Sequence, residues 1–125
     1  MAGATRPPGS RILVVDDSLD SAETLGELLK IWGHEVRLAH DGPGAVTAAR
    51  EYRPEVILLD IGLPGMDGFA VAAQLKKEGL GGRMLVALTG YGEQGDRDRA
   101  QKAGFDHHLV KPINPDTLQK LLAPK

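Results

Sequence analysis

Polar side chains follow four short apolar runs of this chain, at the point where each run ends. The runs are 12–15, 56–59, 84–88 and 109–110, and the residues after them are Asp16 with Asp17, Asp60, Thr89 and Lys111. If the runs are parallel strands of one sheet, these side chains gather at one edge, because ligands bind at the carboxyl ends of such strands. Three carboxylates, a hydroxyl and an ammonium together are suited to hold a metal ion and a phosphoryl group.

The charge of this cluster favours a hard divalent cation. Two carboxylates about 4 Å apart repel by roughly 4 kcal/mol at an effective dielectric constant near 20, so three clustered acids are unstable without a partner. Lys111 can offset one charge, whereas a divalent cation can offset two. The cluster contains no His or Cys, which disfavours zinc and copper, and its oxygens suit Mg²⁺. The sequence therefore predicts Mg²⁺ as the cofactor.

A carboxylate beside Mg²⁺ and a lysine can attack phosphorus and form an aspartyl phosphate. Asp60 follows a wholly apolar run, so a buried strand would deliver its side chain to the edge. Lys111 and the metal would neutralise charge on the transferring oxygens, while Thr89 and the backbone N–H of Gly90 would bind a further oxygen.

Each of these residues also has an ordinary structural interpretation. An Asp at the end of a strand is often a turn or cap residue, and Asp17 could cap the helix that follows it. Lys111 could be a surface lysine. These interpretations do not explain why all of the residues would meet at one edge of a sheet, and the adjacent acids Asp16 and Asp17 make that coincidence harder to explain.

Composition limits the class of protein. A chain of 125 residues with a net charge of -2 suggests one domain that does not bind nucleic acid or an anionic membrane. It has no Cys, which excludes disulfides and thiol nucleophiles. No apolar stretch approaches the roughly 20 residues that span a bilayer, and residues 1–10 do not resemble a signal peptide. We expect a cytoplasmic protein with no membrane segment in this chain.

The elements that must position the cluster alternate along the chain. Apolar runs and segments of helical period alternate five times, which predicts an α/β fold with a parallel sheet. Strands are expected at 12–15, 35–39, 56–59, 84–88 and 105–110, and helices at 18–32, 43–53, 68–77, 92–103 and 115–122. Residues 1–10, rich in Pro and Gly, are expected to be a disordered tail or linker, with the domain at 11–123.

The segment 92–103 has few apolar residues. It offers only Ala100 and Ala103 to a core, so we expect a weakly anchored and mobile helix, as movable elements come from the least stable parts of a fold. An ordinary solvated helix is the alternative.

Four segments together resemble the receiver domain of two-component response regulators. They are ILVVDDS at 12–18, ILLDIGLPGMDG at 57–68, ALTGYG at 87–92 and AGFDHHLVKP at 103–112. Each segment alone is weak evidence for this family, but four segments in this order, with a Lys-Pro pair after the fifth strand, are strong evidence together. The resemblance spans nearly the whole chain and implies a single doubly wound, flavodoxin-like sheet of five parallel strands, order 2-1-3-4-5, flanked by five helices.

The resemblance also implies a role for each residue of the cluster. Asp60 would be the phosphoacceptor. Magnesium would be held by Asp16, Asp17, Asp60 and the backbone carbonyl of Gly62, the phosphoryl oxygens by Thr89, Lys111 and the backbone of Gly90, and the switch residues would be Thr89 and His108. The peptide bond between Lys111 and Pro112 is expected to be cis.

Two positions depart from the pattern of that family. His108 stands where an aromatic switch residue is usual, and its imidazole is smaller and titratable. Gly62 stands where many relatives carry a side chain that influences how fast the phosphate is lost. The coupling of the switch and the lifetime of the phosphoryl group therefore do not follow from the resemblance.

The implied function is that of a signalling receiver. It would take a phosphoryl group from a histidine kinase or a histidine phosphotransfer protein, and would switch a surface made by the fourth helix, fifth strand and fifth helix toward an unknown downstream protein. It would take part in its own phosphorylation and dephosphorylation without being an enzyme for a separate substrate. The sequence fits either a stand-alone regulator or the receiver of a hybrid histidine kinase. The segment FDHHLVKP at 105–112 favours the hybrid kinase, because it resembles receivers of such kinases.

Three other classes fit the residues less well. An aspartyl phosphatase of the haloacid dehalogenase type needs a second acid two residues after its nucleophile, whereas Ser18 lies two residues after Asp16. A flavodoxin-like electron carrier needs a hydroxyl-rich phosphate loop after the first strand. A degenerate receiver that acts only as a docking module is disfavoured by the complete set of site residues.

Overall fold

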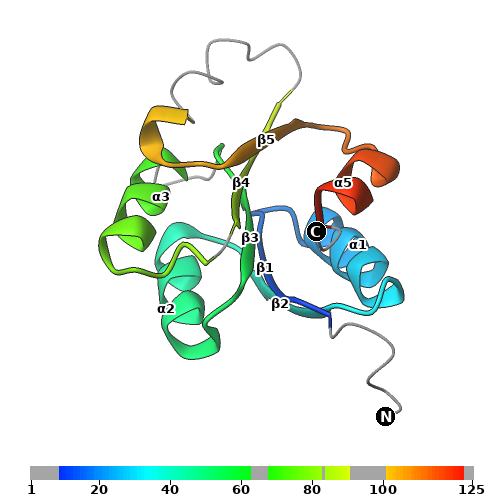
Figure 1. Ribbon diagram of the computed structural model, residues 1–125, viewed down its shortest axis with the longest axis horizontal. Coiled ribbons are helices and arrows are strands. Elements are labelled where there is room, and N and C mark those ends of the chain that lie inside the picture. The colour runs from blue at the N-terminus through cyan, green and yellow to red at the C-terminus, as the bar shows by residue number, and fades with distance from the viewer. Residues whose placement is uncertain (1–8, 63–67, 83, 91–100, 123–125) are drawn as a thin grey trace.

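The computed structural model describes residues 9–62, 68–82, 84–90 and 101–122 (Figure 1). Five parallel strands form one sheet in the order β2-β1-β3-β4-β5, which confirms the predicted flavodoxin-like topology. The strands are β1 (Arg11–Val15), β2 (Glu35–Ala39), β3 (Val56–Asp60), β4 (Met84–Thr89) and β5 (His107–Val110).

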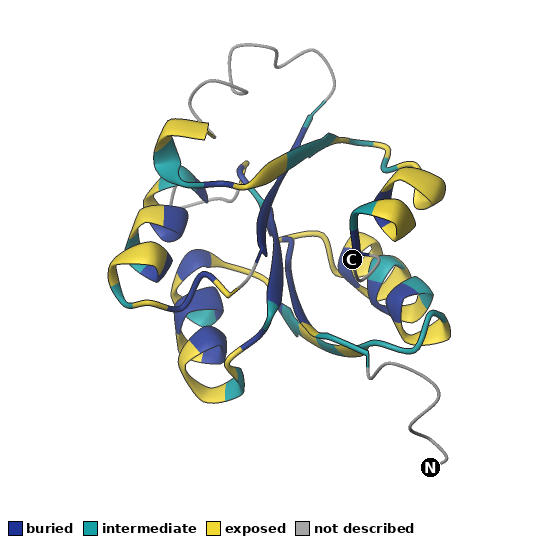
Figure 2. Ribbon diagram, in the orientation of Figure 1, coloured by how far each residue is buried: buried dark blue, intermediate teal, exposed yellow. Residues whose placement is uncertain are grey.

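Burial follows the place of each strand in the sheet. The central strands β1, β3 and β4 are almost wholly buried, as expected for apolar runs covered by helices on both faces. The edge strands β2 and β5 instead include exposed residues (Figure 2). Since Asp60 and Thr89 are the last residues of β3 and β4, each belongs to its strand rather than following it.

Helices cover both faces of the sheet. Figure 1 shows α2 (Gly42–Tyr52) and α3 (Gly68–Lys77) on one side and α1 (Leu19–Ile31) and α5 (Pro115–Leu122) on the other. Alternate residues of β1 divide between the two cores: Leu13 and Val15 face α2 and α3, whereas Ile12 and Val14 face α1 and α5. This period of two is what a strand between two helical layers requires.

Polar side chains set the helix starts. Ser18 caps α1 by accepting a hydrogen bond from the backbone N–H of Ser21 at 3.3 Å, so the helix proper begins at Leu19 rather than at 18 as predicted. Asp41 caps α2 in the same way through the N–H of Gly44. Asn114 accepts from two N–H groups at the start of α5 and caps that helix.

One predicted strand is longer than the observed one. We expected a strand over 105–110, but β5 begins at His107. Phe105 is buried in the core, where its ring meets Phe69 edge-on at 6.2 Å between centroids. Asp106 exchanges two hydrogen bonds with the backbone of Leu85, through its own N–H and its carboxylate. The chain is therefore anchored to the core and to β4 before the ladder of β5 begins.

Two predictions concern residues that are wholly or mostly outside the described part of the chain. Of the expected helix at 92–103, only 101–103 are described, and they are helical. Of the expected tail at 1–10, Gly9 and Ser10 are described, and the carbonyl of Ser10 accepts from the N–H of Glu35. The mobility of the first segment and the domain bounds 11–123 stay predictions.

The shared direction of the strands creates the edge where the polar residues meet. β1 and β3 run in register, Val15 beside Leu59, so the residues that follow them are neighbours. After β5 the chain passes through a cis peptide between Lys111 and Pro112, as expected. Within the described part of the chain, no helix combines the length and the apolar character needed to span a membrane.

Candidate functional site

Lys111 bridges two of the carboxylates predicted to meet at this edge. Its Nζ lies 2.8 Å from Oδ2 of Asp60 and 3.0 Å from Oδ2 of Asp16. The three side chains come from the ends of β3, β1 and β5, and are 95 residues apart along the chain at most. The sheet topology alone brings them together, which confirms that these three of the predicted site residues share one location.

Asp16 is a charged residue in a buried position, with 3% of its surface exposed. One carboxylate oxygen accepts from the backbone N–H of Ser18 at 2.9 Å and the other from Lys111. A buried carboxylate is tolerated when it has such partners. Asp16 is therefore held in one orientation from both sides.

Asp60 is held in a similar way but is more accessible. Its side chain is 14% exposed, and its Oδ1 accepts from the backbone N–H of Gly62 at 2.8 Å. A Cβ on Gly62 would lie 3.4 Å from this oxygen, an ordinary contact, and Gly62 does not have a positive φ. Glycine at 62 is therefore not required by the backbone, and it leaves Asp60 open on this side.

Gly68, at the start of α3, differs from Gly62. A Cβ there would lie 2.4 Å from Cα of Ile61, which no residue tolerates without a shift of the backbone. Gly68 therefore allows α3 to begin against the end of β3, and Gly62 has no such packing role.

The three acids are close enough to share a cation. Asp16, Asp17 and Asp60 each offer an oxygen within 4.8 Å of the others. These oxygens are near enough to one another for all three acids to hold one cation. Lys111 neutralises one of these three charges, and Asp17 is exposed. The donor atoms and the remaining negative charge fit a hard divalent cation.

The environment of Lys111 keeps it charged. Burial lowers the pKa of the ammonium, but its hydrogen bonds to Asp60 and Asp16 and the charges of both acids outweigh that effect, and the pKa is raised above its ordinary value of 10.5. Lys111 is thus a protonated hydrogen-bond donor at neutral pH, and it can hold an anionic oxygen where it now holds the carboxylates.

Thr89 is buried, but its hydroxyl is turned toward the neighbouring strand. Its Oγ1 donates to the carbonyl of Leu109 at 3.4 Å, and the carbonyl of Thr89 accepts from the N–H of Lys111 at 2.8 Å. Gly90 follows at the end of β4, and His108 is half-buried on β5 beside Ala87. The phosphate-binding and switch roles of Thr89, Gly90 and His108 stay predictions.

An open groove of about 750 Å³ leads to the acids from one side. Asp16 and Lys111 line it where it meets the site, and Leu25 and Leu28 of α1 and Ile113 after β5 give it an apolar wall. A partner that reaches Asp60 along this groove would contact apolar surface on the way.

His40 belongs to this site although the sequence interpretation did not include it. Its Nδ1 lies 3.0 Å from the backbone carbonyl of Asp16. His40 directly follows β2, so a rule that took the polar residue after every predicted strand would have found it. It was missed because only wholly apolar runs were considered, whereas the strand predicted at 35–39 alternates polar and apolar residues.

Residues 12–123 match the family model of the response regulator receiver domain. The chain belongs to this family. The receiver fold thus accounts for the sheet order.

Individual relatives agree with this assignment. The chain is 33% identical over 114 residues to Protein PilH of Pseudomonas aeruginosa, and the match covers 90% of this chain and 94% of PilH. It is 39% identical over 108 residues to the DNA-binding response regulator MtrA of Mycobacterium tuberculosis, with 86% of this chain and 46% of MtrA covered. The chain therefore spans about half the length of MtrA.

Solved structures show the same fold. The structure of the chemotaxis response regulator CheY4 of Vibrio cholerae matches with a TM-score of 0.82 at 30% identity, covering 91% of this chain and 96% of CheY4. The chain is thus similar both to a relative of its own size and to one domain of longer regulators.

Proposed function

We propose that this receiver accepts a phosphoryl group from a phosphohistidine onto Asp60, with Mg²⁺ as cofactor. The observation that carries the proposal is the position of Lys111, bonded at once to Asp60 and Asp16 in a cluster where three acids lie within 4.8 Å. Asp60 is the acid that combines contact with Lys111 and partial exposure, so it is the natural nucleophile.

The transfer is a displacement at phosphorus. A carboxylate oxygen of Asp60 forms the new P–O bond while the P–N bond to the donor imidazole breaks, and the imidazole nitrogen keeps the electron pair. Lys111 moves its hydrogen bond from the carboxylate to an oxygen of the arriving phosphoryl group. Bound Mg²⁺ would supply positive charge to the phosphoryl oxygens, held by Asp16, Asp17, Asp60 and the carbonyl of Gly62.

Thr89 and His108 would report the phosphorylation. The hydroxyl of Thr89 would leave the carbonyl of Leu109 and bind a phosphoryl oxygen together with the N–H of Gly90. His108, half-buried on the neighbouring strand, would then move and change the surface of β5 and α5 together with the fourth helix. A downstream protein would bind this surface and distinguish its two states.

The donor would be a histidine kinase or a histidine phosphotransfer protein, which places the receiver in the cytoplasm. The apolar groove beside Asp16 and Lys111 is suited to a helix that presents a phosphohistidine. The receiver takes part in its own phosphorylation and dephosphorylation and has no separate substrate. A parent hybrid histidine kinase stays our preferred context, on the basis of the segment 105–112.

The test is phosphorylation by a small phosphodonor or by a phosphohistidine protein in the presence of Mg²⁺. Intact-mass measurement should show one added phosphoryl group in the wild type and none in Asp60→Asn. Glu27→Gln, which changes an exposed acid of α1 outside both the acidic cluster and the groove, is the control and should still be labelled. A wild type without label, folded and supplied with Mg²⁺, would indicate a docking module instead.

A further inference from the structure

The carbonyl of Asp16 is held by a side chain rather than by the sheet. The N–H of Asp16 donates to the carbonyl of Ala39 at 3.0 Å, as the ladder between β1 and β2 would continue. Two residues after Ala39, Asp41 forms the N-cap of α2. At this point the imidazole of His40 provides the contact to the carbonyl of Asp16, at 3.0 Å.

The direction of this hydrogen bond is determined by chemistry. A backbone carbonyl only accepts, so Nδ1 of His40 must carry the proton and donate it. The neutral ring can have this tautomer, and the imidazolium has the same N–H. The contact is therefore available in both protonation states.

This carbonyl belongs to the peptide unit that joins Asp16 to Asp17. A peptide unit is planar, so a bond that fixes the direction of its carbonyl also fixes its N–H and the path of the chain into Asp17. Asp16 has three other anchors, at its N–H and at both carboxylate oxygens. Asp17 is exposed, and the bond from His40 holds the peptide unit directly before it.

We propose that His40 is a positioning residue for magnesium binding, which acts by orienting the Asp16–Asp17 peptide so that Asp17 faces the other two acids. The inference rests on the proposed function, since it assumes that the three acids hold Mg²⁺. Two observations support the inference. His40 contacts the carbonyl of Asp16, and an oxygen of Asp17 lies within 4.8 Å of oxygens of Asp16 and Asp60 although the side chain of Asp17 is exposed.

The experiment compares two substitutions at one position. His40→Ala removes the donor. His40→Asn keeps one, because the amide nitrogen of Asn is as many bonds from Cα as Nδ1 of His. His107→Ala removes an exposed histidine of β5, the edge strand on the other side of the sheet, and serves as the control.

The first measurement is the Kd of Mg²⁺ by calorimetry, with no phosphodonor present. His40→Ala should weaken binding by on the order of threefold to tenfold, as the loss of one hydrogen bond does, and His40→Asn should restore most of the affinity. The amide NMR signal of Asp17 should shift in His40→Ala and return in His40→Asn. Stability in urea should change little, since the side chain is exposed.

The second measurement is the phosphorylation rate against Mg²⁺ concentration. His40→Ala should be slow at limiting Mg²⁺ and equal to wild type at saturation, because the group acts on metal affinity and not on the reacting atoms. Equal Kd values for wild type and His40→Ala would overturn the inference, and so would an Asn variant as weak as Ala. A wild type that binds no Mg²⁺ would instead overturn the proposed function.

Discussion

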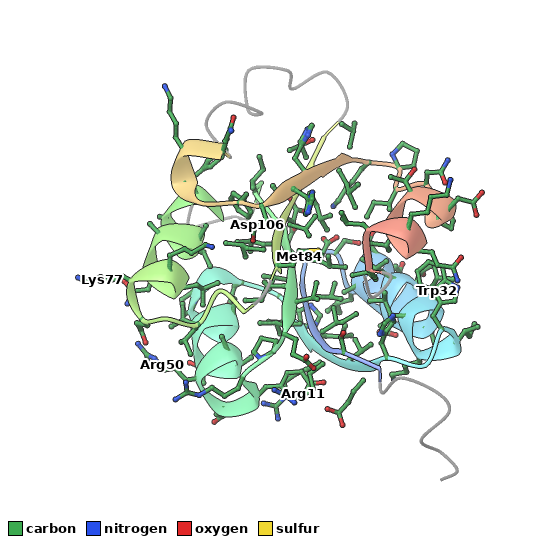
Figure 3. All side chains as sticks on the ribbon, in the orientation of Figure 1. Arg11, Trp32, Arg50, Lys77, Met84 and Asp106 are labelled. Carbon is green, nitrogen blue, oxygen red and sulfur yellow. The ribbon has the colours of Figure 1, made fainter. Side chains whose placement is uncertain are left out.

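Two groups of charged residues in this molecule differ in their balance of positive and negative charge. Arg50 of α2, labelled in Figure 3, donates from Nε and Nη2 to the two carboxylate oxygens of Glu78, which directly follows α3, at 2.7 and 2.8 Å; this is one cation for one anion at the surface. At the carboxyl edge of the sheet, Lys111 faces two acids and a third stands next to them. The first group is balanced in charge, and the second is not.

The difference indicates what each group is for. A balanced pair at the surface contributes little to stability and needs nothing else. An unbalanced acidic cluster with a buried member costs stability through repulsion, and is tolerated in a fold that recovers the cost when a cation binds. This contrast supports the proposal that the edge cluster is the functional site, whereas a structural role is enough to explain the pair between α2 and α3.

The largest expected effect is on magnesium at the unbalanced cluster. Asp17→Asn should weaken Mg²⁺ binding by on the order of a hundredfold or more, because removing one unit charge about 4 Å from another already removes roughly 4 kcal/mol at an effective dielectric constant near 20. Stability without Mg²⁺ should stay within about 0.5 kcal/mol or rise, since repulsion is relieved. Calorimetry and urea unfolding measure the two quantities.

Asp20→Asn is the control for this substitution, because Asp20 is exposed on α1 and outside the cluster. Unchanged Mg²⁺ affinity in Asp17→Asn would remove Asp17 from the ligand set. The contrast between the two groups of charges would then lose its functional meaning.

The next effect concerns the cation that the cluster already has. Lys111→Met keeps an unbranched side chain, one atom shorter, but removes the cation between Asp16 and Asp60. We expect a loss of about 1–3 kcal/mol in the free energy of unfolding, less than breaking a fully buried pair costs. The expected loss is smaller than for a fully buried pair because the lysine side chain is 32% exposed and solvent screens its charge. Urea unfolding with and without Mg²⁺ should show that the metal recovers part of the loss.

Lys76→Met is the matched control for Lys111→Met, because Lys76 is exposed and, among the residues that the structure describes, pairs with one acid, Asp106, at 4.0 Å. Its loss of stability should be small and independent of Mg²⁺. An equally small loss in Lys111→Met would contradict the central place of Lys111 in the cluster.

A smaller effect is expected at the balanced pair. Arg50→Gln removes the cation between α2 and α3, and both side chains are at the surface. We expect a slight decrease in unfolding free energy and no change in phosphorylation of Asp60. A clear decrease in phosphorylation would show that the surface pair is coupled to the site.

The smallest effect is a pH dependence of the same pair. Hydrogen bonds from Arg50 and from Gln74 lower the pKa of Glu78 from 4.5 to about 2 in the folded protein. The unfolded chain therefore takes up a proton near pH 4.5 while the folded protein resists it. The contribution of Glu78 is present above about pH 4.5 and is lost as the pH falls toward 2. Wild type and Glu78→Gln, unfolded in urea at pH 5 and pH 3, should differ less at pH 3.

Much of this architecture could be predicted without coordinates. The apolar runs and the helical period specified the alternation of strands and helices, and polar residues at strand ends predicted the common location of Asp16, Asp60 and Lys111. The start of β5 was missed because Phe105 looks like a strand residue, yet its ring is buried against Phe69 before the ladder begins. Packing overrode a local pattern there.

The sequence by itself determined which residue types reach the carboxyl edge, because the period of a strand and the end of an apolar run are local properties of the chain. Only the tertiary structure decided how these residues are paired. Lys111 bonds to Asp16 and Asp60, the hydroxyl of Thr89 donates to the carbonyl of Leu109, and His40 donates to the carbonyl of Asp16. Such choices depend on shifts of about an ångström in loops from distant parts of the chain, and hydrogen bonds weaken steeply over that range.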